Sequence, residues 1–188
     1  MDRDYGIFSL KDKVIVVTGG TKKYGYHFCE ALAEAGGTVI LTSRDKKQAD
    51  AVAEKFRARG LNVTGCQLEL MDDNSIGEFV SSVLRDHGRI DVLVNNARHI
   101  PRLPPYEIDR KELDNLFAVN CVGLILLTRR VAEEMRKTGG GNIINIGSIY
   151  GMVGQDLGIY EKPDINFSWD YAFQKGGAVA YTKQLATV

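Results

Sequence analysis

The chain has 188 residues, of which 44% are hydrophobic, and this is enough for one globular domain with a substantial core. Twenty-four basic residues balance twenty-four acidic ones, so net charge favours neither nucleic acid nor an anionic membrane as a partner. The start of the chain is charged and lacks an apolar signal core, and we expect that no stretch approaches the length of a membrane span. The three cysteines lack metal-binding or CxxC spacing, so we expect reduced thiols, no metal site and a cytoplasmic protein.

Short apolar strands alternate with amphipathic helices along the chain. The pattern predicts strands at 13–18, 38–42, 62–66, 91–94 and 142–146. It predicts helices at 24–35, 46–59, 72 or 73 to 87, 110–137 and from about 171, several of them ended by glycine. This alternation indicates parallel βαβ units with right-handed crossovers. We therefore predict one α/β domain, residues 1–188, built on a doubly wound parallel sheet.

The turn after the first strand is rich in glycine and is followed by a helix. Glycines at such a turn let the backbone approach a pyrophosphate, and the N-terminus of the helix offers free N–H groups and a positive dipole end. We therefore predict a dinucleotide site with contacts from Thr18, Gly19, Thr21, Lys22, Lys23, Tyr24 and Gly25.

The end of the second strand reads Thr42-Ser43-Arg44-Asp45. An acidic residue at this strand tip binds a ribose 2′-hydroxyl, whereas an arginine accommodates a 2′-phosphate. Ser43 is neutral, Arg44 follows it, and Lys22 is expected nearby, so NADP is favoured over NAD as the cofactor. The alternative is that Arg44 is a solvated loop charge and Asp45 caps the next helix.

Four polar residues in the second half of the chain can form a proton-transfer site. Tyr171 and Lys175 are one helical turn apart, so a cation lies on the same helix face as the phenol and favours the phenolate form that base catalysis needs. Ser148 follows the fifth strand, and Asn120 interrupts an apolar helix, where a buried amide needs hydrogen-bond partners. Alternatively, Tyr171 and Lys175 are a surface pair and Ser148 only begins a loop.

Taken together, these motifs resemble the short-chain dehydrogenase/reductase family, whose fold is Rossmann-like. The matching pieces are the turn at Thr18-Gly19, Asn95-Asn96-Ala97 after the fourth strand, and the Asn120, Ser148, Tyr171 and Lys175 set. The resemblance implies that Tyr171 is the general acid or base and that Ser148 holds the substrate oxygen. It implies that Lys175 assists Tyr171 and binds the nicotinamide ribose, and that Asn120 holds a water in a proton relay.

The same resemblance implies further contacts and partners. Glu69 lies where the family usually has an aspartate near the adenine, and Asn95, Asn96 and Ala97 would line the adenosine and ribose side of the cofactor. The alternative for the Asn95-Asn96 pair is a turn after a strand. The helix at 110–137 and the last helix resemble the pair that makes subunit contacts in this family, so a homodimer or homotetramer is expected.

The chain departs from the family pattern in several places. Lys23 replaces the middle glycine of the turn. Arg98 replaces the glycine expected after Ala97, which puts a bulky cation near the presumed nicotinamide side. The segment 152–169 is an unusually long insertion, and it indicates a substrate-facing flap, a packed surface excursion or a subunit contact. The resemblance to family members with similar insertions suggests a sugar or sugar-derived substrate. The chain ends within the last helix, so we expect the strands that follow in the family to be missing and the domain to be incomplete.

Two functions remain open on these observations. The first is an oxidoreductase that uses NADP, or NAD as the alternative, to interconvert a secondary alcohol and a ketone. The second is a non-catalytic nucleotide-binding or scaffold protein, which Lys23 and Arg98 favour and the Asn120, Ser148, Tyr171 and Lys175 set opposes. Nucleic-acid binding has only two lysine pairs behind it and is not expected.

Overall fold

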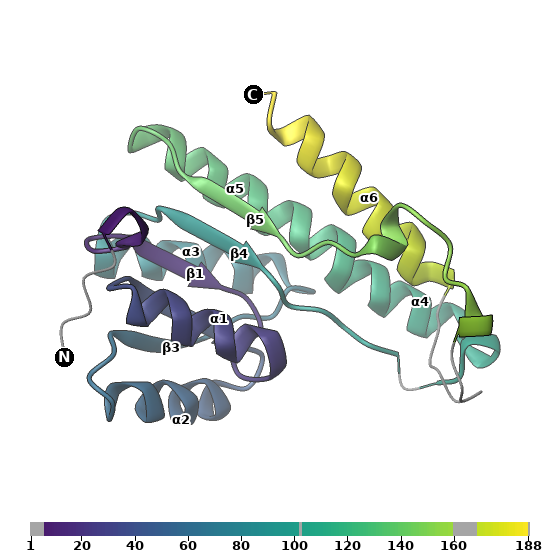
Figure 1. The fold of residues 1–188 in the computed structure, drawn as a ribbon, viewed down its shortest axis with the longest axis horizontal. Helices are drawn as coiled ribbons and strands as arrows, with labels where there is room; N and C mark the ends of the chain where they lie inside the picture. Colours follow the sequence, from purple (N-terminus) through teal and green to yellow (C-terminus); the bar gives the residue numbers. More distant parts are fainter. Residues whose placement is uncertain (1–5, 102, 160–168, 188) are drawn as a thin grey trace.

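A single parallel sheet organises the computed structural model, which describes residues 6–101, 103–159 and 169–187. The strand order is β3-β2-β1-β4-β5 (Figure 1). The strands are β1 (Val14–Val17), β2 (Thr38–Ser43), β3 (Val63–Gln67), β4 (Val92–Asn95) and β5 (Asn142–Asn145). All four strand pairings are parallel. The predicted doubly wound parallel sheet is confirmed.

The helices follow the predicted order, with ends shifted by at most a few residues. They are α1 (Lys23–Glu34), α2 (Lys46–Arg57), α3 (Asp73–His87), α4 (Arg110–Phe117), α5 (Leu124–Lys137) and α6 (Trp169–Leu185). The helix predicted at 110–137 contains a π-helical segment, η3 (Ala118–Gly123), between α4 and α5. Short 3₁₀ turns lie at η1 (Gly6–Phe8), η2 (Pro105–Glu107), η4 (Ile149–Gly151) and η5 (Leu157–Ile159).

The core has two layers because both faces of the sheet are covered by helices (Figure 1). In β1, Val14 and Val16 belong to the layer that contains the buried side chains of α3 and α5. Ile15 and Val17 belong to the other layer, with the buried side chains of α1 and α2. A strand buried on both faces is expected to be a continuous apolar run, and this explains why the β1 sequence does not alternate.

The strand order reverses at β1, and this reversal positions the site. β1 pairs with β2 on one side and β4 on the other, so the connections after β1 and β4 leave on opposite faces. Loops that diverge in this way open a crevice at the carboxyl ends of the two strands, where open α/β sheets bind their ligands. The glycine turn after β1 and the loop after β4 border this crevice.

The expectation that no stretch approaches the length of a membrane span was wrong. The described residues contain one helical stretch, Arg110–Lys137, that is long and apolar enough to cross a membrane by length and composition. This is weak evidence for a span, because the core helix of a soluble protein passes the same test. Leu127 and Val131 of this stretch are fully buried against the sheet.

Candidate active site

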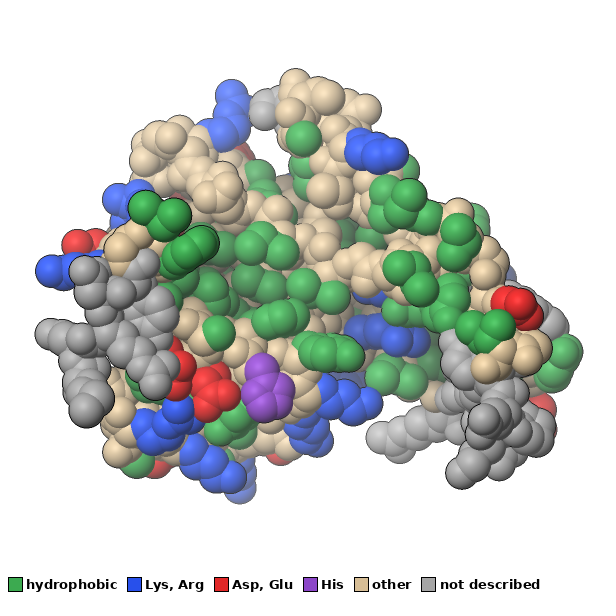
Figure 2. Space-filling view, in the orientation of Figure 1, with side chains coloured by type: hydrophobic (Ala, Val, Ile, Leu, Met, Phe, Trp, Pro, Cys, Tyr) green, Lys and Arg blue, Asp and Glu red, His purple; other side chains and the backbone are tan. Residues whose placement is uncertain are grey.

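A cavity of about 560 Å³ lies where the glycine turn, the ends of β2 and β4 and the N-terminal half of α6 meet. Figure 2 shows a hollow at the lower centre of the molecule, with Lys and Arg side chains on its wall. Ten of the predicted site residues line the cavity: Gly19, Thr21, Lys22, Lys23, Tyr24, Arg44, Glu69, Ala97, Tyr171 and Lys175. Elements far apart in the sequence therefore converge on one concave site.

The glycine turn is fastened to the end of β4 by a small hydrogen-bond network. The Thr18 hydroxyl accepts hydrogen bonds from the backbone N–H groups of Asn96 (3.0 Å) and Ala97 (2.9 Å). The side-chain amide of Asn96 donates in turn to the carbonyl oxygens of Thr18 (2.9 Å) and Gly19 (3.2 Å). Thr18 is buried and does not line the cavity. In this geometry it supports the turn, and its side chain does not reach the predicted cofactor site.

Two glycines of the turn are required by its shape. Gly19 has φ of 65°, which side-chain-bearing residues rarely adopt. A Cβ on Gly25 would collide with the Gly19 carbonyl oxygen and lie 2.6 Å from the Asn96 side-chain nitrogen. Gly25 does not line the cavity; it lets α1 pack against the turn that does.

The N-terminus of α1 faces this cavity without a capping side chain. Helices α2, α3 and α4 are capped by Asp45, Asp72 and Asp109, whose carboxylates accept N–H bonds from the first turn. Lys22, the N-cap of α1, makes no such bond, and the first turn of α1 has no acidic residue. Free N–H groups and the positive end of the helix dipole are therefore offered to an anionic ligand.

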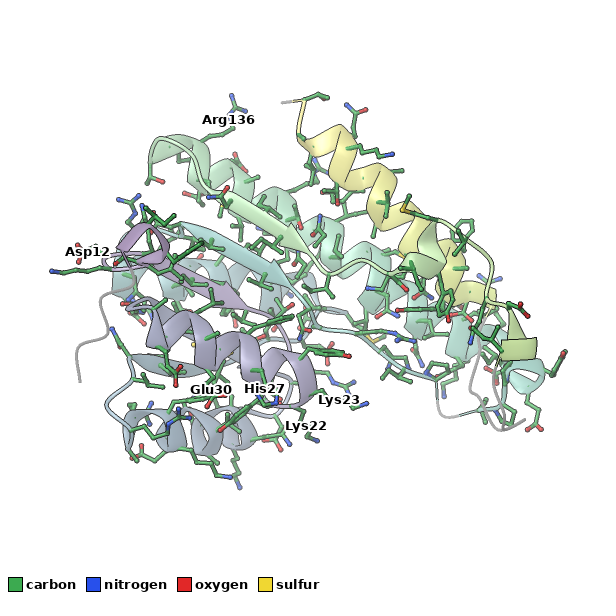
Figure 3. All side chains as sticks on the ribbon, in the orientation of Figure 1. Asp12, Lys22, Lys23, His27, Glu30 and Arg136 are labelled. Carbon is green, nitrogen blue, oxygen red and sulfur yellow. The ribbon has the colours of Figure 1, made fainter. Side chains whose placement is uncertain are left out.

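Lysines stand at the start of α1, where Figure 3 shows Lys22 and Lys23 at the N-terminal end of the helix. Lys23 has φ of 50°, so the position does need the left-handed region that the family's glycine supplies. Both lysines are exposed and line the cavity, which adds positive charge beside the free N–H groups. The backbone of the turn is thus preserved despite the substitution.

We expect Lys23→Gly to relieve this backbone conformation and to raise the free energy of unfolding by up to about 1 kcal/mol. Thermal unfolding of the variant beside the wild type measures the change. A decrease in stability would mean that contacts of the Lys23 side chain outweigh the strain at its backbone.

The residues at the tip of β2 divide between the cavity wall and the start of α2. Arg44 and Ser43 line the cavity, whereas the Asp45 carboxylate accepts from the Gln48 N–H and caps α2. The Ser43 hydroxyl donates to the Gln48 side chain. The alternative role of Asp45 as a helix cap is confirmed, and Arg44 remains directed to the cavity wall.

The two asparagines after β4 have different environments. The side chain of Asn95 is buried and donates to Thr128 (2.9 Å) and Asn145 (2.8 Å), away from the cavity. Asn96, one residue later, lines the cavity. The predicted Asn95 contact therefore does not come from its side chain in this geometry, because alternate residues of a strand point to opposite faces.

Asn120 lies in the π-helical segment and ties three parts of the site together. Its side-chain oxygen accepts from the His99 N–H (2.7 Å), and its nitrogen donates to the His99 carbonyl (3.0 Å) and to Gln174 of α6 (2.8 Å). All its side-chain polar groups are thus hydrogen-bonded, which explains how a partly buried amide is accommodated within this apolar helix. A π-helical turn shifts the backbone hydrogen-bond pattern and commonly marks functional sites. Asn120 itself does not line the cavity.

Tyr171 and Lys175 occupy the first half of α6 and both line the cavity. The ammonium of Lys175 donates to the carbonyl oxygen of Ile146, at the end of β5, and lies 5.9 Å from the centre of the Tyr171 ring. Burial lowers the pKa of Lys175, and the nearby charge of Arg98 lowers it further. The helix is seated by Gly151, where a Cβ would lie 2.7–2.8 Å from the backbone of Lys175 and Gly176.

Ser148 is placed close to this end of the sheet but not against Tyr171. Its hydroxyl accepts from the Tyr150 N–H (3.2 Å) and caps η4. Within the described residues no hydrogen bond joins Ser148 to Tyr171, and Ser148 does not line the cavity. Residues 160–168 of the long segment 152–169, expected as a substrate-facing flap, a packed excursion or a subunit contact, lie outside the described residues.

Several cavity residues were not predicted from the sequence. Leu68, Leu70, Ile100 and Val119 form apolar parts of the wall. Asn96 and Arg98, which were expected near the cofactor, line the cavity from the loop after β4. Arg98 lies with its guanidinium carbon 4.1 Å from the centre of the Tyr171 ring. A sequence pattern shows that Arg98 departs from the expected glycine, but it gives no indication of a contact with a residue 73 positions later.

Comparisons with known proteins agree with this geometry. The family profile for short chain dehydrogenase matches residues 13–186, nearly the whole chain. The chain belongs to the short-chain dehydrogenase/reductase family. This family is an NAD(P)-dependent enzyme class.

Individual relatives share about a third of their residues with the chain. An uncharacterized oxidoreductase of Thermotoga maritima is 36% identical over 94% of this chain and 65% of the relative. A cyclopentanol dehydrogenase of Comamonas is 34% identical over 77% of this chain and 58% of the relative. Gluconate 5-dehydrogenase of Gluconobacter oxydans is 30% identical over 96% of this chain and 67% of the relative.

A solved structure supports the fold. A proposed short-chain dehydrogenase/reductase from Burkholderia xenovorans superposes with a TM-score of 0.81 and 28% identity, over 95% of this chain and 69% of that one. The chain spans less than two thirds of the length of the Thermotoga and Comamonas relatives, at 65% and 58%.

Proposed function

We propose that the protein is an NAD(P)-dependent oxidoreductase that interconverts a secondary alcohol and a ketone. One observation carries the proposal: Tyr171 and Lys175 line the same cavity as the glycine turn and the uncapped start of α1. The cationic turn and free N–H groups fit the pyrophosphate of a dinucleotide. When bound, the cofactor supplies the hydride acceptor or donor.

The side chains around Tyr171 supply the proton chemistry. In the oxidation direction the Tyr171 hydroxyl group, as phenolate, takes the proton of the substrate alcohol; in reduction it returns that proton to the carbonyl oxygen. Lys175, held by the Ile146 carbonyl, places a positive charge beside the phenol. Ser148 orients the substrate oxygen once its hydroxyl turns from the Tyr150 N–H. Asn120 holds the loop after β4 through its hydrogen bonds to the backbone of His99.

The test is turnover by the purified protein with NADP and NAD as oxidants and a panel of secondary alcohols, followed at the absorbance of the reduced cofactor. The panel includes cyclopentanol and gluconate, which the names of two relatives specify. Cofactor reduction that depends on an alcohol supports the proposal. Saturable cofactor binding without turnover of any alcohol or reduction of any ketone would favour the scaffold alternative.

We propose NADP(H) as the preferred cofactor. Arg44 lines the cavity at the tip of β2, Lys22 lies across from it in the turn, and the nearest aspartate, Asp45, is engaged as a helix cap. A guanidinium is suited to a 2′-phosphate, and the strand tip carries no free carboxylate to bind a 2′-hydroxyl.

Arg44→Ser is therefore expected to weaken NADPH binding by about 10- to 100-fold, the worth of a charge-assisted hydrogen bond, and to leave NADH binding within a few-fold. Fluorescence titration with each cofactor measures both constants. Equal effects on the two cofactors would contradict a role for Arg44 at the 2′-phosphate and leave NAD as the alternative.

We also propose a class of substrate, an oligomeric state and a cellular location. The long insertion at 152–169 supports a sugar or sugar-derived substrate, since aromatic residues beside acids and amides suit hydroxyl-rich molecules. The 72% exposed Phe173 on α6 supports the proposed homodimer or homotetramer. A cytoplasmic location is proposed from the reduced state expected of Cys29, Cys66 and Cys121.

The alternative function, a non-catalytic nucleotide-binding or scaffold protein, is favoured by one observation. Arg98 covers the face of Tyr171 and adds bulk at the predicted nicotinamide end of the cavity. The retained placement of Tyr171 and Lys175 beside the turn weighs against this alternative.

A further inference from the structure

Arg98 is an arginine of the candidate active site whose guanidinium forms no ion pair or hydrogen bond among the described residues. Its guanidinium lies over the Tyr171 ring, 4.1 Å from the ring centre, and Arg98, Tyr171 and Lys175 line the same cavity. The charge of Asp170 acts on Arg98 at longer range, while one oxygen of that carboxylate accepts from Gln174 (2.9 Å).

The stacking fixes where the guanidinium is but leaves its donors free. A guanidinium on an aromatic face keeps its N–H groups in its own plane, pointing outward past the ring edge. Those N–H groups match the two oxygens of a carboxylate in a bidentate pair. The stacking thus holds a set of N–H donors beside the Tyr171 hydroxyl group, which we propose contacts the reacting oxygen of the substrate.

The charge distribution of the cavity separates this arginine from the cofactor contacts. The described wall has five Lys or Arg side chains and one carboxylate, Glu69. Lys22, Lys23 and Arg44 come from the glycine turn and the β2 tip, where the phosphates of a dinucleotide are expected. Arg98 comes from the loop after β4 and rests on α6, at the Tyr171 end of the cavity. Lys22, Lys23 and Arg44 therefore supply the cations expected beside the phosphates, and Arg98 is an additional cation beside Tyr171.

We propose that Arg98 determines substrate specificity by binding the carboxylate of an anionic substrate, a hydroxy acid or its keto acid, beside Tyr171. The inference rests on the proposed oxidoreductase function and deepens it. The substrate hydroxyl group meets Tyr171 while its carboxylate pairs with the Arg98 fork, so the two contacts orient the carbon that exchanges hydride. A neutral alcohol lacks the second contact.

The experiment compares hydroxy acids with their methyl esters, which share a carbon skeleton and differ in charge. 3-Hydroxybutyrate, 4-hydroxypentanoate and 5-hydroxyhexanoate, each beside its methyl ester, are oxidised by the wild type, Arg98→Met, Arg98→Lys and Arg136→Met. Arg98→Met keeps the length of the side chain and removes its charge, and Arg98→Lys keeps the charge without the fork. Arg136, an exposed arginine at the end of α5 away from the cavity, controls for loss of a surface charge (Figure 3).

The wild type is expected to prefer at least one acid to its ester. Arg98→Met should lower kcat/KM for that acid by about 10- to 100-fold, and leave the ester within a few-fold. Arg98→Lys should recover part of the loss, because a point charge replaces a bidentate fork. Arg136→Met should leave the acid-to-ester ratio unchanged.

Three results would overturn the inference and are distinguishable from each other. In the first, the protein oxidises esters or neutral alcohols and prefers no acid, or its acid-to-ester ratio does not change in Arg98→Met. This result keeps the oxidoreductase proposal but means that Arg98 does not determine specificity. A loss of NADPH affinity in Arg98→Met that matches the loss in acid turnover assigns the arginine to a cofactor phosphate. Absence of turnover with every compound, by folded protein, contradicts the proposed function itself.

Discussion

Tyr171→Phe is expected to lower kcat for alcohol oxidation by about 10²- to 10⁴-fold, the contribution of a positioned general acid or base. The substitution removes one hydroxyl group and keeps the ring that Arg98 covers, so the shape of the cavity wall is preserved. Affinity for NADPH is expected to stay within a few-fold of the wild type, because the glycine turn and α1 are untouched. Steady-state kinetics and a fluorescence titration measure the two quantities.

Tyr181→Phe is the matched control on the same helix. The Tyr181 hydroxyl group is buried and has no hydrogen-bond partner among the described residues, and its side chain lines a separate apolar cavity with Phe117 and Phe173. Its removal should leave turnover unchanged. Equal kinetics of Tyr171→Phe and Tyr181→Phe would show that the Tyr171 hydroxyl takes no part in the reaction and would return the protein to the scaffold alternative.

Gly25→Ala is expected to have the largest effect on the nucleotide site. Its Cβ would press on the Gly19 carbonyl oxygen and lie 2.6 Å from the Asn96 nitrogen that braces the turn. Overpacking of this kind costs about 1–3 kcal/mol of stability. Because the displaced atoms are the backbone of the turn, we also expect NADPH binding to weaken by at least about 10-fold, the effect of losing one charge-assisted contact to the pyrophosphate.

Gly77→Ala is the control for adding a methyl group to a helical glycine. A Cβ at Gly77, in α3, would meet only the Arg130 guanidinium at 3.6 Å, an ordinary contact. Alanine is favoured over glycine in helices by about 1 kcal/mol, so this variant should be as stable as the wild type or more stable. Unchanged NADPH binding by Gly25→Ala would mean that the turn does not contact the cofactor.

The fold could be predicted from the sequence because its signals are local. The β-branched run at β1 and the glycine after α3 each fix a local conformation, and Gly88 has the left-handed φ of 75° that ends the helix as expected. The Asp72 cap was likewise visible in the sequence, since an aspartate before an apolar helical pattern is typical of an N-cap. The π-helical segment was not visible in the sequence, and the hydrogen bonds that Asn120 makes from it to His99 and Gln174 join distant parts of the chain.

Many residues of the candidate site could be predicted from the sequence, but which of their side chains reach the cavity could be predicted less well. Residues on the glycine turn and α6 were found because each belongs to a motif with fixed spacing. Which of Asn95 and Asn96 reaches the cavity depends on where β4 ends, and a shift of one residue exchanges their faces. The Arg98 stacking on Tyr171 joins two distant segments, so no local pattern contains it.

The central claim is that the cavity between the glycine turn and α6 binds a dinucleotide within reach of Tyr171. The most direct test is a fluorescence titration of the wild-type protein with NADPH and NADH, repeated with Gly25→Ala and Tyr171→Phe. The account predicts saturable binding by the wild type, with NADPH tighter than NADH, retention of binding in Tyr171→Phe and loss in Gly25→Ala. Failure of the folded wild-type protein to bind either cofactor would contradict it.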